Sequence, residues 1–186
     1  MEFLHKLDLP PLTSVIREDI KDTFFTEFFK SRVSSYDSSN ILKEEFLNLK
    51  NLEWHKVLLF LKTPNHTGVV HRDNSFGDER LHANILWVHG NGGIKYWDSD
   101  KIISTNPAID IHSNLPMTGF EVDKTPTKDY KTTSGSVYLL NASVAHAAYN
   151  DVHETENRYS IALRCRPRQN LSWNTLVDLF SDLIIE

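Results

Sequence analysis

Two histidines and an aspartate stand where they could share one metal ion. His71 and Asp73 are separated by a single residue, and because side chains alternate along a strand, both would point to the same face. His146 follows the β-rich segment Gly135 to Leu140, and a closed two-sheet fold would return it to the first pair. Two imidazoles and a carboxylate are the ligands of a non-haem Fe(II) centre that keeps open coordination positions. A His-x-Asp pair alone is weak evidence in a chain with nine histidines, so His146 carries the prediction.

Twelve residues after His146 begins a segment that reads as a strand with two chemically different faces. One face carries Arg158, Ser160, Ala162 and Arg164, and the other carries Tyr159, Ile161, Leu163 and Cys165. A guanidinium can hold a carboxylate through two parallel hydrogen bonds, and a nearby hydroxyl can add another. Because Ala162 leaves room beside them, we expect Arg158 and Ser160 to bind one end of a dicarboxylate.

Length and composition fit one domain. The 186 residues are 40% hydrophobic and 24% charged, enough for a full core. No apolar run resembles a signal-peptide core or reaches the ~18 residues of a membrane span, so we expect a soluble, cytoplasmic protein without membrane contact. The single cysteine, Cys165, leaves nitrogen and oxygen as the metal ligands. The net charge of -5 argues against a broad phosphate-binding surface, although a local basic patch of Arg158, Arg164, Arg166 and Arg168 stays open.

The elements that must position these residues follow from the hydrophobic pattern. Helical spacing predicts helices over 16–32, 40–49 and 170–185. Between them, short β-rich runs occur at 57–61, 68–72, 83–89, 94–97, 120–122, 137–140, 145–149 and 159–165. Gly90-Asn91-Gly92-Gly93 is typical of a hairpin turn. We therefore predict a single mainly β domain of sandwich or jelly-roll type, with a core over about 56–166, N-terminal helices over about 12–50 and a C-terminal helix over about 170–185.

Taken in order, these motifs resemble the Fe(II)- and 2-oxoglutarate-dependent oxygenases that have a double-stranded β-helix core, and among them the prolyl-4-hydroxylase-like branch. The likeness covers roughly residues 68–166. It includes the metal motif with its following turn at 71–80, the strand at 83–89, Gly92-Gly93 before the next strand, the distal His146 and the run at 158–161. The resemblance implies the jelly-roll, cupin-like fold that the strand pattern predicts.

Carried over by position, the resemblance implies that His71, Asp73 and His146 bind Fe(II). Arg158, assisted by Ser160, would pair with the distal carboxylate of 2-oxoglutarate. Three further co-substrate contacts are expected, from Ile85, Trp87 and Arg164. A plain core role for Trp87 stays open, since its indole N–H needs a partner in either case.

The activity implied is hydroxylation of an unactivated C–H bond, with O2 and 2-oxoglutarate consumed and succinate and carbon dioxide released. The branch favours a prolyl group of a peptide or protein as substrate, while free amino acids and other small molecules are handled by similar cores. We expect no nucleic-acid substrate. Two departures from the family are a longer gap between His146 and Arg158, and an arginine where the collagen-type enzymes use lysine.

Alternative functions remain at this point. An AlkB-like oxidative demethylase is suggested by Arg164, but the acidic charge and the lack of a basic, aromatic-rich N-terminal lid argue against it. A cupin that binds metal without 2-oxoglutarate fits Gly135, His146 and Asn150 loosely, yet its first motif needs two histidines and a glutamate close together. A non-catalytic module would have lost a ligand or the arginine. The other histidines, including His82, show no metal spacing and are interpreted as structural or solvated.

Overall fold

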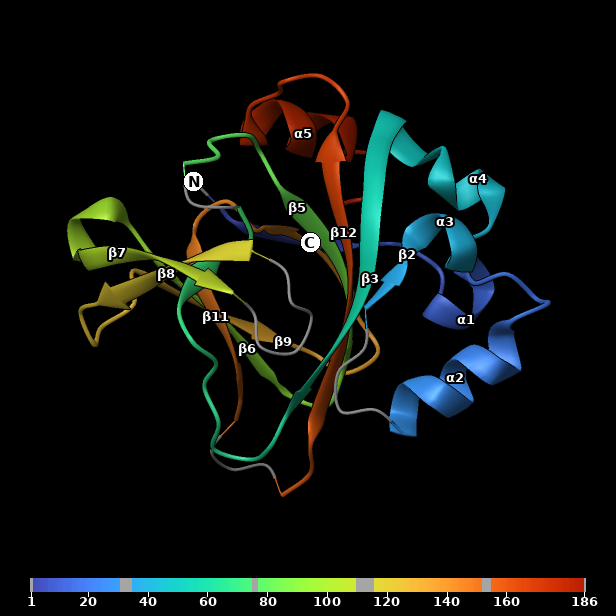
Figure 1. Ribbon diagram of the computed structural model, residues 1–186, viewed down its shortest axis with the longest axis horizontal. Helices are drawn as coiled ribbons and strands as arrows, with labels where there is room; N and C mark the ends of the chain where they lie inside the picture. The colour runs from blue at the N-terminus through green and yellow to red at the C-terminus, as the bar shows by residue number, and fades with distance from the viewer. Residues whose placement is uncertain (1, 31–34, 75–76, 110–115, 152–154, 186) are drawn as a thin grey trace.

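The computed structural model describes residues 2–30, 35–74, 77–109, 116–151 and 155–185, and within them two antiparallel six-stranded sheets face each other (Figure 1). The larger sheet has the order β1 (Leu4–Leu7), β10 (Val137–Asn141), β5 (Ala83–His89), β12 (Arg158–Pro167), β3 (Leu52–Lys62) and β2 (Ser35–Asp37). The smaller sheet has the order β7 (Ile102–Ile109), β8 (Pro116–Val122), β4 (His71–Arg72), β11 (Ala145–Asn150), β6 (Gly92–Trp97) and β9 (Lys128–Thr132).

Consecutive strands often change sheet, which is what makes the architecture a double-stranded β-helix. The chain crosses from β5 to β6, from β10 to β11 and from β11 to β12, each time leaving one sheet for the other. The prediction of a mainly β jelly roll is confirmed. The hairpin predicted at Gly90 to Gly93 is wrong, because β5 and β6 belong to different sheets and the turn is a corner between them. A glycine-rich turn specifies a sharp reversal of the chain and leaves open which strand pairs with which.

The helices are shorter than the sequence pattern predicts. They are α1 (Leu12–Val15), α2 (Lys21–Lys30), α3 (Ser38–Ile41), α4 (Glu44–Leu47) and α5 (Trp173–Leu179), with 3-10 turns η1 (Leu49–Asn51) and η2 (Ser99–Lys101). The first predicted helix includes Ile16, which instead forms an isolated β-bridge with Leu42 and is fully buried there. Residues 31 and 32 of that prediction lie outside the described residues. None of the helices in the described ranges is long and apolar enough to cross a membrane.

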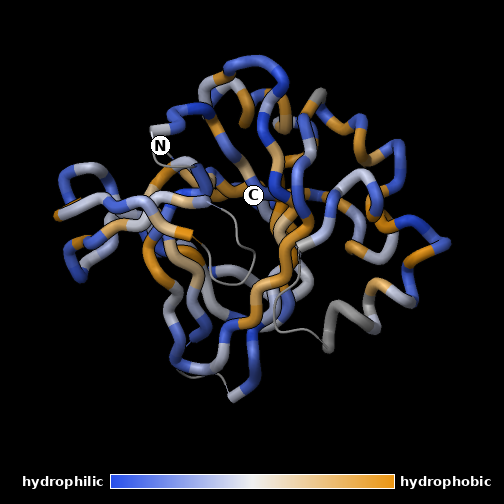
Figure 2. Tube along the Cα trace, in the orientation of Figure 1, coloured by the Kyte–Doolittle hydropathy of each residue, from blue (hydrophilic) through white to orange (hydrophobic). Residues whose placement is uncertain are grey.

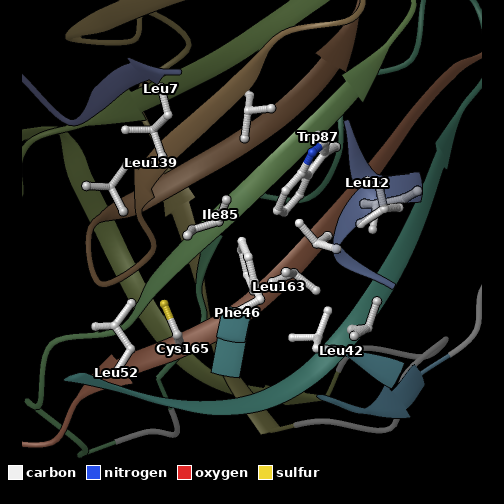
Figure 3. Close-up of a cluster of buried hydrophobic side chains, with 14 of the residues drawn as sticks. Leu7, Leu12, Leu42, Phe46, Leu52, Ile85, Trp87, Leu139, Leu163 and Cys165 are labelled. Atoms are coloured by element: carbon white, nitrogen blue, oxygen red, sulfur yellow. The ribbon is translucent and has the colours of Figure 1, made fainter. Parts of the chain in front are cut away.

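Side-chain alternation in the larger sheet gives it two different faces. Its outer face packs against helices α1 to α4 and α5, and Figure 3 shows this cluster, with Leu12, Leu42 and Phe46 contributed from outside the sheet and Ile85, Trp87, Leu139, Leu163 and Cys165 from its strands. The inner face, toward the smaller sheet, carries Leu58, Leu86, Val88, Tyr138, Leu140 and Ala162. Apolar chain segments accordingly concentrate in the strands, and hydrophilic ones in the turns (Figure 2). The two faces therefore have different tasks, and only the inner one can line a site between the sheets.

The outer cluster should dominate stability. Leu163 is fully buried in it, so Leu163→Ala is expected to lower the free energy of unfolding by about 2–5 kcal/mol, the usual cost of a cavity left by a leucine. Leu179 on α5 is 42% exposed, and Leu179→Ala should cost less than about 1 kcal/mol. Urea denaturation of both variants measures the difference. Equal losses would contradict this account of the core.

Candidate metal centre

His71, Asp73 and His146 converge on one point between the sheets. One ligand atom from each lies within 4.8 Å of the others. The convergence follows from strand pairing, because β4 lies beside β11 and His71 is the direct cross-strand partner of His146, with their ring centroids 4.7 Å apart. His71 Nε2 lies 3.3 Å from Asp73 Oδ1. The residues predicted from the sequence to share a metal ion are thus brought together.

Both imidazoles are oriented by their own backbone neighbourhood. The Nδ1 of His71 lies 2.9 Å from the carbonyl oxygen of Val69, and the Nδ1 of His146 lies 2.8 Å from that of Val144. A carbonyl oxygen can only accept a hydrogen bond, so each Nδ1 carries the proton and donates. In the neutral ring each Nε2 therefore has a lone pair for a metal ion, the arrangement typical of histidine ligands, whereas a protonated His71 donates from Nε2 to Asp73 Oδ1.

Asp73 is held by two residues of the larger sheet. Asn84 Nδ2 donates to Asp73 Oδ2 at 2.8 Å, and Arg164 Nε lies 3.4 Å from the same oxygen. Arg164 Nη2 also donates to the backbone carbonyl of Asp73. Burial acts to raise the pKa of Asp73, but the Arg164 cation and the hydrogen bond from His71 outweigh it and hold that pKa well below its usual value. Asp73 is therefore a carboxylate whose Oδ1 remains on the histidine side, where a cation would sit.

The two histidines differ in basicity. Burial and the neighbouring His71 lower the pKa of His146 to about 4, so this ring is neutral near pH 7. Burial acts to lower the pKa of His71, but the hydrogen bond and the charge of Asp73 outweigh it and raise that pKa above the usual value. Two imidazoles with free Nε2 atoms and one carboxylate fit a small divalent cation that takes nitrogen and oxygen ligands.

Arg158 is the second unusual group on the inner face. It is fully buried, its Nη2 donates to Thr132 Oγ1 at 3.3 Å, and its Nε and Nη1 have no hydrogen-bond partner among the described residues. Burial lowers its pKa to about 10. Space for the side chain comes from Gly92, whose backbone has φ of 143° and where a Cβ would lie 2.9 Å from Arg158 Cδ. A buried cation without a carboxylate is costly, so the geometry suits an anion at this position.

Ser160 and Arg164 lie on the same inner face of β12 as Arg158, as alternation predicts. Ser160 is 2% exposed, and Ala162 lies between it and Arg164 in the inner apolar cluster. Arg158 and Arg164 thus stand at opposite ends of one strand face. Arg164 reaches the metal cluster through Asp73, and Arg158 reaches Thr132 on β9.

The expected contacts of Ile85 and Trp87 with a co-substrate are corrected by the structure. Both side chains lie on the outer face of β5, where Trp87 Nε1 donates to the carbonyl of Pro10 at 3.0 Å and its ring lies 5.9 Å from that of Phe46. The core role left open for Trp87 is the observed one. The prediction failed by one residue of register, because the inner positions of β5 are Asn84, Leu86 and Val88. Asn84 and Thr132 were missed. Alternation along β5 places Asn84 on the inner face once Ile85 and Trp87 are known to lie on the outer face, whereas nothing local marks Thr132.

Comparison with known proteins supports the fold. No family model and no curated protein matches the chain. Among solved structures, EvdMO1 matches with a TM-score of 0.51 and 11% sequence identity, over 90% of this chain and 48% of its own, so this chain spans about half its length. HygX from Streptomyces hygroscopicus with iron bound matches with a TM-score of 0.46 and 14% identity, over 89% of this chain and 83% of its own. AviO1 from Streptomyces viridochromogenes matches with a TM-score of 0.43 and 14% identity, over 70% of this chain and 60% of its own.

At 11% sequence identity, the match to EvdMO1 supports the fold alone. Fold and site together define the class. The chain is a cupin-like, double-stranded β-helix protein whose described residues include a His/Asp/His cluster that could hold a metal ion.

Removing the amide that orients Asp73 should weaken metal binding without removing a ligand. Asn84→Ala is expected to lower Mn(II) affinity by about 10- to 100-fold, as the loss of a residue that supports a ligand does. The matched control is Asn106→Ala on the exposed strand β7, which should leave affinity unchanged. Titration calorimetry or the Mn(II) electron paramagnetic resonance signal measures both. An unchanged affinity for Asn84→Ala would argue against Asp73 as a ligand.

Metal affinity should fall on acidification. A metal ion must displace the proton that His71 holds below its raised pKa, while His146, with a pKa of about 4, is already deprotonated. Below the pKa of His71, affinity should therefore drop about tenfold per pH unit, corresponding to one proton released per ion bound. Mn(II) titrations across pH 5 to 8 check this. A pH-independent affinity over that range would contradict the assigned ligand.

Proposed function

We propose that this protein is an Fe(II)- and 2-oxoglutarate-dependent oxygenase that hydroxylates an unactivated C–H bond. The observation that carries the proposal is the pairing of two features on one inner face: a His/Asp/His cluster with both Nε2 atoms free, and a buried arginine whose Nε and Nη1 have no partner among the described residues. The first suits ferrous iron with open positions. The second suits one carboxylate of a diacid.

Each residue has a definite task in this proposal. His71 and His146 would bind iron through Nε2, and Asp73 through Oδ1, while Asn84 and Arg164 keep the carboxylate oriented. Bound iron together with 2-oxoglutarate and O2 supplies the oxidation of the substrate carbon, with succinate and carbon dioxide as the other products.

Arg158 would anchor the distal carboxylate of 2-oxoglutarate, with Ser160 beside it. The carbon chain of the co-substrate would then lie along the apolar part of the inner face, over Ala162 and Leu86. These side chains exclude water from the path between the anchor and the metal cluster. This strengthens every electrostatic contact made there.

The proposed primary substrate is a prolyl group of a peptide or protein, or an amino acid. This choice rests on the likeness of the motifs to the prolyl-4-hydroxylase-like branch and not on any contact in the structure. A screen of candidate peptides and amino acids by mass spectrometry should reveal a gain of one oxygen, accompanied by succinate. The Asp73→Ala variant is the negative control. Oxygen gain that persists in Asp73→Ala would contradict a role for this cluster.

The arginine provides the sharper test. Arg158→Met should lower the affinity for 2-oxoglutarate in the presence of Mn(II) by about 100-fold, because a charge-assisted bidentate contact is lost. Affinity for Mn(II) itself should not change, and stability should not fall, since a buried cation with unpaired nitrogens is replaced by an apolar chain of similar length.

The control is Arg168→Met, at an exposed position beyond β12. It should leave the affinities for 2-oxoglutarate and for Mn(II) unchanged. Calorimetric titration of each variant with 2-oxoglutarate and with Mn(II) measures these affinities. If Arg158→Met binds 2-oxoglutarate as tightly as the unmodified protein, the oxygenase proposal fails. A metal-binding cupin that does not use 2-oxoglutarate would then account for the site.

A further inference from the structure

Two histidines that show no pattern in the sequence lie side by side near the metal cluster. His55 comes from β3 and His82 from the segment just before β5, so they flank β12 on either side. Their rings are stacked, with centroids 6.5 Å apart and planes 17° from parallel. Arg164, which holds Asp73, stands on the strand between them. The pair therefore adjoins the metal cluster at the end of the sheet opposite Arg158.

An irregularity in strand pairing turns His55 toward the inside. Leu163 pairs with Val57, but Cys165 pairs with Trp54, so two residues of β3, His55 and Lys56, stand opposite Arg164. Trp54 packs toward the outer cluster, and the next residue, His55, is thereby placed on the inner face. Such bulges commonly re-aim a side chain beside a functional site.

His82 is fixed by its backbone. Its N–H donates to Ser143 Oγ at 2.6 Å, and its carbonyl accepts from the N–H of Ala142 at 3.1 Å. The backbone of His82 is thus held against the turn that leads into β11, the strand of His146. Its position is set by the same framework as that of the metal cluster.

Three buried nitrogens in this region have no hydrogen-bond partner among the described residues. They are His55 Nε2, His82 Nε2 and Arg164 Nε. Buried polar atoms are almost always paired in folded proteins, so several orphans at one place indicate that a water, an ion or a ligand completes them. Arg164 Nε always carries a hydrogen, and each histidine Nε2 carries one in the tautomer protonated there, so a single acceptor can complete all three nitrogens.

The carboxylates nearby leave the two histidines without an acceptor, because Asp73 Oδ2, 3.4 Å from Arg164 Nε, already accepts from Asn84, and Asp78 and Glu53 are paired with arginines. Asp78 accepts from Arg80 at 2.8 and 2.9 Å, and Glu53 accepts from Arg166 at 2.8 and 3.1 Å. The closest approach of His82 Nε2 to Asp78 Oδ2 is 3.6 Å, too long for a hydrogen bond.

The charge balance of the region indicates what kind of acceptor fits. Arg80, Arg164 and Arg166 are each matched by one carboxylate, as described above. Burial, together with the arginines, lowers the pKa values of His55 and His82, so both rings are neutral donors. Two flat neutral donors beside a guanidinium nitrogen suit a group with one negative charge. Because the arginines are already matched, each added negative charge is uncompensated, and a phosphate dianion would cost more in this part-buried site than a carboxylate with a single charge.

We propose that His55 and His82, with Arg164 Nε between them, form a carboxylate-binding subsite next to the metal cluster, and that the primary substrate of the proposed oxygenase carries that carboxylate. The carboxylate belongs either to a small acid or to an acidic side chain of a peptide. Anion binding at the two histidines is inferred from the position of their rings and from their unpartnered Nε2 atoms. Its assignment to the primary substrate rests on the proposed function.

The test is a titration with acetate, followed at the histidine rings by nuclear magnetic resonance. Protein labelled with 15N in histidine is loaded with Zn(II), which is redox-inactive, and with 2-oxoglutarate, so that Arg158 is already engaged. Acetate should give saturable shifts at His55 and His82. His55→Gln and His82→Gln should each weaken acetate binding about tenfold, as loss of a hydrogen bond to a charged group does. His66→Gln, at an exposed position, is the control and should bind acetate normally.

Several outcomes would overturn the subsite: no shift at the two rings, an acetate affinity in both glutamine variants equal to that of the unmodified protein, or tighter binding of phosphate than of acetate. Backbone spectra of the variants show whether they fold. A parallel titration without 2-oxoglutarate separates the two proposals, because failure of 2-oxoglutarate to bind removes the proposed function while acetate shifts would still establish the anion subsite. Comparing N-acetylglutamate with a glutamate-containing peptide then distinguishes a small acid from a peptide side chain as the source of the carboxylate.

Discussion

The contact between Asp73 and the larger sheet is the interaction on which the rest of the site depends. Strand pairing alone places His71 opposite His146, but both histidines belong to the smaller sheet. Asp73 is also held by Asn84 on β5 and Arg164 on β12, which reach it from the other sheet. One carboxylate, kept ionised by the Arg164 cation and the hydrogen bond from His71, thus joins the two layers and completes the cluster. The three candidate ligands lie on the smaller sheet or directly after its strand β4, and the larger sheet supplies the residues that hold the carboxylate in place.

Strand β12 organises the inner face along its length. Its inward residues run from Arg158, buried without a carboxylate partner among the described residues, through Ser160 and Ala162 to Arg164 at the metal cluster. Its outward residues pack under the helices, so the strand cannot shift without disturbing the core. Two cations on one rigid strand therefore stand in a fixed relation to the cluster. This rigidity is what a site needs to hold a co-substrate and a metal ion in register.

The sequence is most informative where residue types that bind metals or anions also fall on the same face of a predicted strand. The convergence of His71, Asp73 and His146, and the inward face of Arg158 and Arg164, were predictable because few residue types bind metals or anions and strands repeat every two residues. Register was not predictable. Trp87 carries a donor that suits either face, and its bond to Pro10 depends on a distant segment. The pairing of His55 with His82 depends on a bulge in β3, which leaves no signature in the sequence. The glycines from Gly90 onward indicate a reversal of the chain, but they do not indicate that β5 and β6 belong to different sheets.

The central claim is that three ligands of the smaller sheet, supported from the larger sheet, hold a single ion, and that Arg158 anchors a diacid that reaches it. Anomalous X-ray diffraction from crystals grown with Mn(II) and 2-oxoglutarate tests it most directly. The account predicts one manganese peak bounded by Nε2 of His71, Nε2 of His146 and a carboxylate oxygen of Asp73, with diacid density ending at the guanidinium of Arg158. A manganese peak elsewhere, or a diacid that does not touch Arg158, would contradict it.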